Sequence, residues 1–207
     1  MASRWRDAVL VFTSFAVIGS GFFCLYADSV LLARIDKVAG GHVPCGADRS
    51  NDAARFTYYK ILILEPSIDH GLAYGIATSV VKHAEAFGHD PNFVLAMIKV
   101  ESRHFDPKSE STAGAIGLMQ VLPQWLKNQG MQDADLTDID VNIELGLRVF
   151  GFYMEMYNDL EKALTAYNRG PGPVDWADRF GRDPRNGYAA SILEVFEELK
   201  KIDGVVE

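Results

Sequence analysis

Glu101 is the residue of this sequence with the best local case for acid–base chemistry. It ends the segment 91–101, in which Val94, Met97 and Ile98 recur at helical spacing on the face that also carries the carboxyl. An apolar setting raises the pKa of a carboxyl because the charged form loses solvation, and a general acid at neutral pH needs such a shift. The local pattern alone, however, favours a solvent-exposed glutamate that closes a helix.

Several short motifs accompany Glu101 in a fixed order along the chain. They are Glu101-Ser102, Phe105-Asp106-Pro107, Ser111, Gly114-Ala115-Ile116-Gly117-Leu118-Met119-Gln120, Asn142-Ile143 with Gly146, Ala166-Tyr167-Asn168-Arg169-Gly170-Pro171, and Tyr188. Each motif alone is a weak signal, but several in order form a strong one. The order resembles the catalytic domain of the soluble lytic transglycosylases, a lysozyme-like family related in fold to goose-type lysozymes, over roughly residues 70–200. The segment 103–110 departs from the family pattern by one additional residue.

The resemblance implies non-hydrolytic cleavage of the MurNAc-GlcNAc β-1,4 bond of peptidoglycan. Glu101 is the implied catalytic residue: it protonates the glycosidic oxygen and then removes a proton from the C6 hydroxyl, which closes a 1,6-anhydro ring. The resemblance also implies substrate-binding residues. Ser102 and Ser111 would support the glutamate and the substrate by hydrogen bonds, Gly117 would allow close backbone approach, and Met119 and Gln120 would line the cleft. Tyr167 and Asn168 would orient the glutamate and the N-acetyl group of the sugar, and Tyr188 would lie near the catalytic centre.

A second catalytic carboxylate, as most glycosidases use, is not obvious in the sequence. Asp106 and Glu110 are expected on loops, and the acidic stretch Asp133, Asp135, Asp138 and Asp140 is interpreted as solvated surface. Under the family resemblance, a lone glutamate fits chemistry in which the acetamido group of the sugar stabilises the cationic intermediate. A hydrolysing muramidase and a catalytically silent peptidoglycan-binding scaffold of an envelope machine remain as alternatives.

The pattern after residue 66 predicts a mainly α domain. Helices are expected over about residues 72–87, 91–101, 140–157, 160–167 and 188–200, with Asp90 and Pro91 starting the second. Residues 168–173 are expected to form a tight loop, and residues 56–63 fit either a strand or a short helix. We expect His83 and His89 on the surface and His104 as a cation at a helix end. Trp125 is expected either to cap the cleft or to pack in the core, and Trp176 and Phe180 are expected to cover the core.

An uncharged, apolar stretch of 20 residues, Ala8 to Ala27, follows Arg4 and Arg6. As a helix it spans roughly 30 Å, about one bilayer core. Its length and the large Leu25 at the candidate exit favour an uncleaved signal anchor over a cleaved signal peptide. The expected organisation is an anchor at 1–27, a connector at 28–65 and a catalytic domain at 66–207. The basic residues before the anchor place that domain in the periplasm, with the anchor in the inner membrane.

Composition restricts the partners and cofactors. The net charge of −8 and the absence of a basic cluster argue against a nucleic-acid partner. Cys24 and Cys45 lie in different regions, so neither an intrachain disulfide nor a zinc site is expected, and no metal or cofactor is implied. The expected partners are peptidoglycan glycan strands and the inner membrane, and a membrane anchor is also compatible with a secretion or conjugation machinery.

Overall fold

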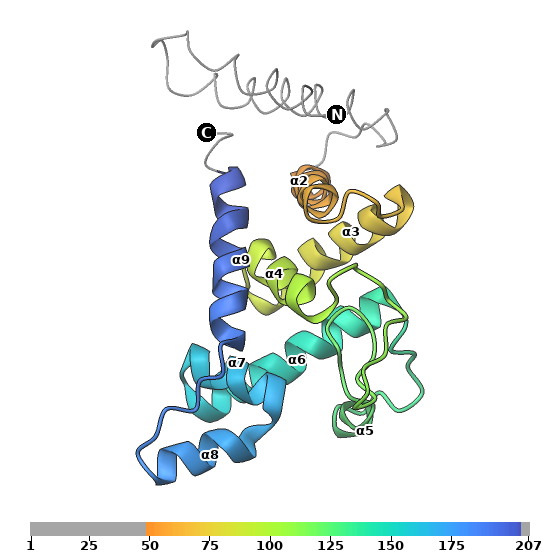
Figure 1. Cartoon of the computed structure of the whole chain (residues 1–207). Coiled ribbons are helices and arrows are strands. Elements are labelled where there is room, and N and C mark those ends of the chain that lie inside the picture. The colour runs from red at the N-terminus through yellow and green to blue at the C-terminus, as the bar shows by residue number, and fades with distance from the viewer. Residues whose placement is uncertain (1–48, 204–207) are drawn as a thin grey trace, which may run out of the picture. The chain divides into compact units, whose positions relative to one another are not determined.

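The computed structural model describes residues 49–203, which fold into helices joined by loops (Figure 1). In chain order these are α2 (Arg49–Leu64), α3 (His70–Phe87), α4 (Pro91–Glu101), α5 (Gln124–Asn128), α6 (Ile139–Tyr157), α7 (Leu160–Arg169), α8 (Pro171–Arg179) and α9 (Tyr188–Asp203). β-Pairing within the described range consists of two isolated bridges, which join Ile116 to Glu110 and to Val121. The expected mainly helical fold is confirmed for this part of the chain.

Capping residues define the boundary between α3 and α4. Gly88 follows α3 in the left-handed conformation, at φ 69°, and its N–H bonds to carbonyls of the last turn. The side chain of Asp90 accepts a hydrogen bond from the N–H of Asn92 at 2.8 Å, and Pro91 occupies the first turn of α4. α4 therefore starts where the sequence predicts, and its length brings Glu101 to its last position.

The stretch 168–173, expected to be a tight loop, is instead the junction of two helices. α7 continues to Arg169, and α8 begins at Pro171. Gly170 lies between them at φ 76°, a value that glycine adopts without steric cost. Proline is well accommodated in a first turn, where its missing N–H has no intrahelical partner to lose. The prediction was wrong because glycine and proline here redirect the helical chain and do not end it.

Helix α2 contains residues 56–63, for which the sequence left a strand and a short helix open. Tyr58 is 1% exposed and Ile61 is fully buried, and α2 packs on α3 and α4. The second half of the expected connector thus belongs to the same compact unit as the helices that follow it. The short helix α5 was not expected from the sequence.

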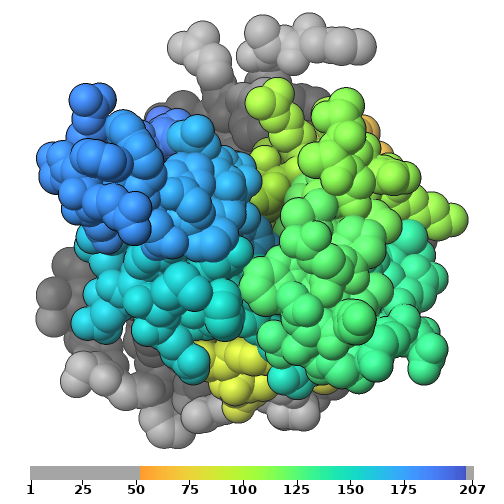
Figure 2. All heavy atoms as spheres, turned by 90° about the horizontal axis from the view of Figure 1, so that it is seen from below, coloured from red at the N-terminus to blue at the C-terminus, as the bar shows by residue number. Residues whose placement is uncertain are grey.

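Helix α4 forms the centre of the core, because residues 94–98 are all fully buried. α3 packs against α4 and against α6, while α9 runs beside α4 (Figure 1). Figure 2 shows a hollow on one face, between the green segment after α4 and the blue segments around α8 and the start of α9.

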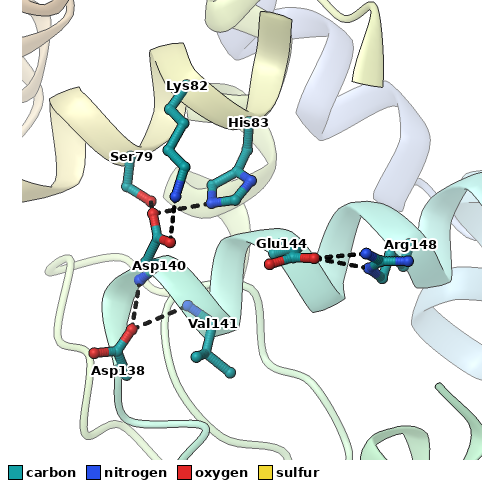
Figure 3. Close-up of polar contacts among 8 residues, drawn as sticks. All are labelled: Ser79, Lys82, His83, Asp138, Asp140, Val141, Glu144 and Arg148. Atoms are coloured by element: carbon teal, nitrogen blue, oxygen red, sulfur yellow. Dashed lines mark hydrogen bonds and ion pairs between the residues drawn. The ribbon is translucent and has the colours of Figure 1, made fainter. Parts of the chain in front are cut away.

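A polar cluster joins α3 to the start of α6 (Figure 3). One carboxylate oxygen of Asp140 contacts His83 Nε2 at 2.9 Å and accepts from Ser79 Oγ at 3.1 Å, and the other oxygen accepts from Lys82 Nζ at 2.6 Å. His83 is 4% exposed, so its expected surface position was wrong. The Asp140 side chain is 46% exposed, as expected of a surface acid, and it also joins α3 to α6. Asp138 caps α6 by accepting from the N–H groups of Asp140 and Val141.

The sequence predicted core or cleft positions for three further aromatic residues, Trp125, Trp176 and Phe180. Trp176 and Phe180 are 51% and 59% exposed, so they do not cover the core as expected. They follow the i, i+4 spacing on the outer face of α8, whereas Val174 and Ala177 face inward. Trp125 packs edge-on against Phe152 and Tyr153.

The expected signal anchor at 1–27 and most of the expected connector lie outside the described residues. Among residues 49–203, no helix combines the length and the apolar character that a membrane crossing requires.

Candidate active site

A cavity of about 320 Å³ opens beside the C-terminal end of α4. Its walls come from the last residue of α4, the loop that follows it, and the turn that precedes α5. The lining residues are Glu101, Ser102, Arg103, His104, Asp106, Ser109, Glu110 and Gln120. The cavity thus combines a carboxyl group with amide and hydroxyl groups, which suits a saccharide ligand.

Glu101 lines this cavity from the last position of the buried helix α4. Met97 and Ile98, one turn earlier, are fully buried. Burial raises the pKa of the Glu101 carboxyl from its ordinary value of 4.5 to about 7, although a hydrogen bond from Tyr188 partly opposes the rise. A substantial fraction of Glu101 is consequently protonated at neutral pH, as a general acid requires.

Tyr188, the first residue of α9, donates its hydroxyl hydrogen bond to Oε1 of Glu101. The chain places 87 positions between these two residues, yet the start of α9 brings the phenol to the end of α4. Burial, together with the charge of Glu101, raises the pKa of Tyr188 well above 10. The phenol therefore stays protonated and serves as a donor that fixes one oxygen of the carboxyl.

Tyr167, on α7, lies close enough to Glu101 for the carboxylate charge to act on it. Burial is the main cause that raises the pKa of Tyr167 well above 10, and the charge of Glu101 adds to the rise. Its hydroxyl donates to the backbone carbonyl of Met119 at 2.7 Å. Tyr167 thereby joins α7 to the turn that carries Gln120.

The turn 116–121 is held by Asn142, a residue of α6 that is 1% exposed. Its Oδ1 accepts from the N–H of Met119 at 2.8 Å, and its Nδ2 donates to the carbonyls of Ile116 and Leu136, each at 2.9 Å. Gly117 lies against this amide at φ 82°, and a Cβ placed there would come within 2.4 Å of Asn142 Nδ2. The close backbone approach expected at Gly117 is therefore made to Asn142 of the protein itself.

Met119 and Gln120 face opposite ways from this turn. Met119 is fully buried against Gly146, so its side chain does not line the cavity, contrary to expectation. Gln120 does line it, at φ 47°, and its Nε2 donates to Ser109 Oγ and to the carbonyl of Gly117, each at 3.0 Å. The turn alternates its side chains, so one neighbour faces the core and the other the cavity.

The two expected serines bond to the loops around the cavity. Ser102 Oγ accepts from the N–H of Asp106, and Ser111 Oγ accepts from the N–H of Ala115, each at 3.0 Å. Asn168 is exposed and accepts from Asn186 Nδ2 at 2.8 Å. Of these residues, Ser102 is the one that lines the cavity.

Sequence reasoning assigned no role to Asn142, Arg103 or Ser109. Asn142 had a usable signal, because an amide among the apolar residues of a predicted buried helix must find hydrogen-bond partners. Arg103 and Ser109 had no signal, since their positions depend on the path of the loop after Glu101. Within the described residues, no group of His, Cys, Asp and Glu side chains is arranged to hold a metal ion.

A family model named Transglycosylase SLT domain matches residues 79–186, more than half of the chain. The chain belongs to this family. The match includes Glu101, the turn 116–121, Asn142 and Tyr167, and it ends just before Tyr188. The recognition made from the sequence is therefore confirmed.

Curated relatives and solved structures extend the comparison. The transglycosylase of Enterobacteria phage PRD1 is 33% identical over 87 residues, which cover 42% of this chain and 32% of the relative. The membrane-bound lytic murein transglycosylase F of Desulfosudis oleivorans is 32% identical over 132 residues, which cover 58% of this chain and 28% of the relative. The chain thus spans about a third of the length of these relatives.

The fold is also that of known SLT proteins. The 70-kDa soluble lytic transglycosylase SLT70 of Escherichia coli superposes with a TM-score of 0.53 at 19% identity, covering 86% of this chain and 35% of that one. An inactive mutant of the lytic transglycosylase Slt of Pseudomonas aeruginosa gives a TM-score of 0.50 at 20% identity, covering 84% and 34%. The helices of this chain therefore form an SLT lysozyme-like fold.

Proposed function

We propose that this chain is a peptidoglycan lytic transglycosylase that cleaves the MurNAc-GlcNAc β-1,4 bond and leaves 1,6-anhydro-muramic ends. The observation that carries the proposal is the position of Glu101, whose carboxyl lines a cavity in an SLT fold and has a pKa of about 7. The names of the relatives, which include two membrane-bound lytic murein transglycosylases, support the same activity.

In the first step, protonated Glu101 gives its proton to the glycosidic oxygen as the C1–O bond breaks. The oxygen leaves as the hydroxyl of the GlcNAc side, and the acetamido group of the muramic sugar stabilises the positive charge at C1. In the second step, the carboxylate of Glu101 removes the proton of the C6 hydroxyl, and O6 bonds to C1 of the same sugar. Glu101 is thereby protonated again, and no water is consumed.

A pKa near neutrality suits both steps, because one carboxyl must act first as acid and then as base. Burial keeps the acid form populated, while the Tyr188 hydrogen bond favours the carboxylate that the second step uses. Tyr188 and Tyr167 remain protonated donors throughout. Gln120 adds an amide to the cavity lining, where a sugar hydroxyl or N-acetyl group can bond.

A single acid/base residue is consistent with the other carboxyls of the cavity. Asp106 and Glu110 also line it, but both are exposed. Asp106 Oδ1 accepts from the N–H of Lys108 at 2.9 Å, so this carboxylate stabilises a turn. Glu101 is the carboxyl of the cavity whose pKa burial raises.

Mass analysis of the products released from purified peptidoglycan tests the proposal. Full-length protein should release muropeptides with anhydro ends, and Glu101→Gln should lower the rate by a factor on the order of a hundred to ten thousand, the usual contribution of a general acid. Glu110→Gln, which changes an exposed carboxyl of the same cavity, is the matched control and should retain activity.

Three results would contradict the assignment in different ways. Reducing ends in place of anhydro ends would make the protein a hydrolysing muramidase. Release of muropeptides by Glu101→Gln at the wild-type rate would remove Glu101 from the catalytic role. Absence of any release by wild-type protein would favour the silent scaffold.

The membrane location is part of the proposal and rests on the apolar stretch Ala8 to Ala27. Full-length protein should stay in the membrane fraction after a carbonate wash, with its catalytic domain in the periplasm. Recovery of a soluble protein that begins near Asp28 would show a cleaved signal peptide instead.

A further inference from the structure

The loop after Glu101 forms one wall of the cavity and has an unusual backbone. Arg103, His104 and Asp106 line the cavity from this loop. Phe105, between them, is fully buried and has φ 55°, a conformation that costs a bulky residue free energy and therefore needs support from its surroundings. The position of this wall thus depends on contacts that hold the loop in place.

Lys99 supplies such contacts from α4, two residues before Glu101. Its Nζ donates to the backbone carbonyl of Arg103 at 2.7 Å and to that of Leu64 at 3.0 Å. The same ammonium lies 5.4 Å from the centre of the Phe105 ring, within the range of a cation–π contact. One side chain therefore contacts the loop twice and links it to the end of α2.

Helix α2 is the second partner of this link, and it precedes the segment that the family model matches. Leu64 is its last residue, and the carbonyls of a last helical turn lack intrahelical partners. A second contact joins the same regions, since His104 Nδ1 lies 2.9 Å from Glu65 Oε2. The His104 side chain is 85% exposed, so this pair contributes less than Lys99.

We infer that Lys99 is a positioning residue for the proposed reaction: it holds the loop 103–106 against the end of α2 and so fixes the cavity wall beside Glu101. This inference rests on the proposed function for its effect on rate. The loop lines the same cavity as Glu101, whose pKa is raised by burial. A loosened wall admits water to the carboxyl and misplaces the bound sugar.

The experiment compares Lys99→Met with Lys60→Met in the full-length protein. Lys60 is a buried lysine of α2 that donates to Asn92 Oδ1 at 2.7 Å and pairs with Asp203 at 2.5 Å. Both changes remove an ammonium that joins α2 to another part of the protein, but only Lys99 contacts the loop beside Glu101. Lys60→Met therefore controls for a general loss of stability.

Two measurements follow each variant. Hydrogen–deuterium exchange of residues 102–109 reports the order of the loop, whose N–H groups at Phe105, Asp106 and Ser109 are hydrogen-bonded within it. The pH dependence of kcat reports the acid form of Glu101. Lys99→Met should speed exchange in 102–109, lower kcat by a factor on the order of ten to a hundred, and move the alkaline limb of the pH profile to lower pH.

Lys60→Met should lower the melting temperature without moving the pH profile or the exchange of 102–109. Lys99→Gln keeps a hydrogen-bond donor, so its effects should lie between wild type and Lys99→Met. Unchanged exchange of 102–109 in Lys99→Met overturns the inference, as does faster exchange with an unchanged pH profile. Inactive wild-type protein overturns the proposed function instead, and the exchange measurement then still decides whether Lys99 holds the loop.

Discussion

The carboxyl of Glu101 is subject to two opposing effects. Burial favours the neutral acid, while the donor from Tyr188 favours the carboxylate, and burial prevails because the pKa reaches about 7. The folded protein therefore holds a proton on Glu101 between pH 4.5 and 7 that the unfolded chain releases. This contribution to stability is complete below pH 4.5 and is lost as the pH rises through about 7.

The loss has a measurable consequence for Glu101→Gln, whose neutral amide does not titrate. The variant should gain stability relative to wild type as the pH rises from 4 to 8, by up to roughly 3 kcal/mol for a shift of this size. Urea unfolding of both proteins at the two pH values gives the difference in free energy of unfolding. A difference that is the same at both pH values would show that Glu101 titrates alike in the folded and unfolded states.

At the residue scale, the sequence identified Glu101 through its motif context and not through its local helix pattern. The helical spacing of the apolar residues before Glu101 fits an exposed helix end equally well. Tyr188, whose hydroxyl bonds to the Glu101 carboxyl, lies 87 positions away in the sequence. Met119 shows the converse limit. Its place in a motif suggested cleft lining, but the left-handed backbone at Gly117 and Gln120 turns the Met119 side chain into the core.

At the scale of elements, α6 sets the shape of the cavity turn through Asn142. Two hydrogen bonds of this side chain hold Ile116 and Met119, a third holds the Leu136 carbonyl, and Gly117 leaves the space that the amide occupies. The turn is therefore positioned by a helix that begins 19 positions after Gln120 in the sequence. A substitution that breaks the contact between Asn142 and this turn should therefore also displace Gln120.

Gly117→Ala and Gly114→Ala form a matched pair that measures this contact. Both glycines have positive φ, 82° and 79°, so alanine costs about 1–2 kcal/mol of backbone strain at either position. A Cβ at position 117 would also approach the Leu136 carbonyl to 2.8 Å, whereas a Cβ at position 114 meets nothing within 4 Å. Gly117→Ala should therefore lower the melting temperature considerably more than Gly114→Ala. If both substitutions lower the melting temperature equally, backbone strain alone accounts for the need for glycine at position 117.

Most helices were predictable because local signals at their ends agree with tertiary packing. Asp90 with Pro91 started α4 at its observed residue, and Gly88 ended α3. The signals failed at Gly170 with Pro171, which mark a change of helix direction as readily as a loop. They were also insufficient for α2, because an apolar aromatic run of eight residues fits a buried strand and a buried helix alike. The contacts of Tyr58 and Ile61 with other helices decide that alternative.

At the scale of the whole molecule, the compact unit extends upstream of the family-matched segment. The described part of this unit begins with α2 at Arg49, whereas the family match begins at residue 79. Between them, α2 buries Tyr58 and Ile61 and reaches the active-site loop through Leu64 and Glu65. Helix α2 is therefore part of the same compact unit as the candidate site.

Two fragments test this extent. A fragment of residues 42–207 should unfold cooperatively, while a fragment of residues 66–207 lacks α2 and should melt at a much lower temperature. Each large apolar side chain that loses its burial costs roughly 1.5–3 kcal/mol, and the total stability of a domain is only about 5–15 kcal/mol. Thermal unfolding followed by circular dichroism measures both. Equal melting temperatures for the two fragments would show that α2 does not contribute to the stability of the unit.

Burial keeps Glu101 protonated near neutral pH, at the end of α4 and in the lining of a cavity of about 320 Å³. The most direct test is a carbon-13 NMR titration of glutamate carboxyl groups in wild-type protein, with Glu101→Gln used to assign the resonance. We expect a titration midpoint for Glu101 at about pH 7. A midpoint near 4.5, the ordinary value for glutamate, would contradict it.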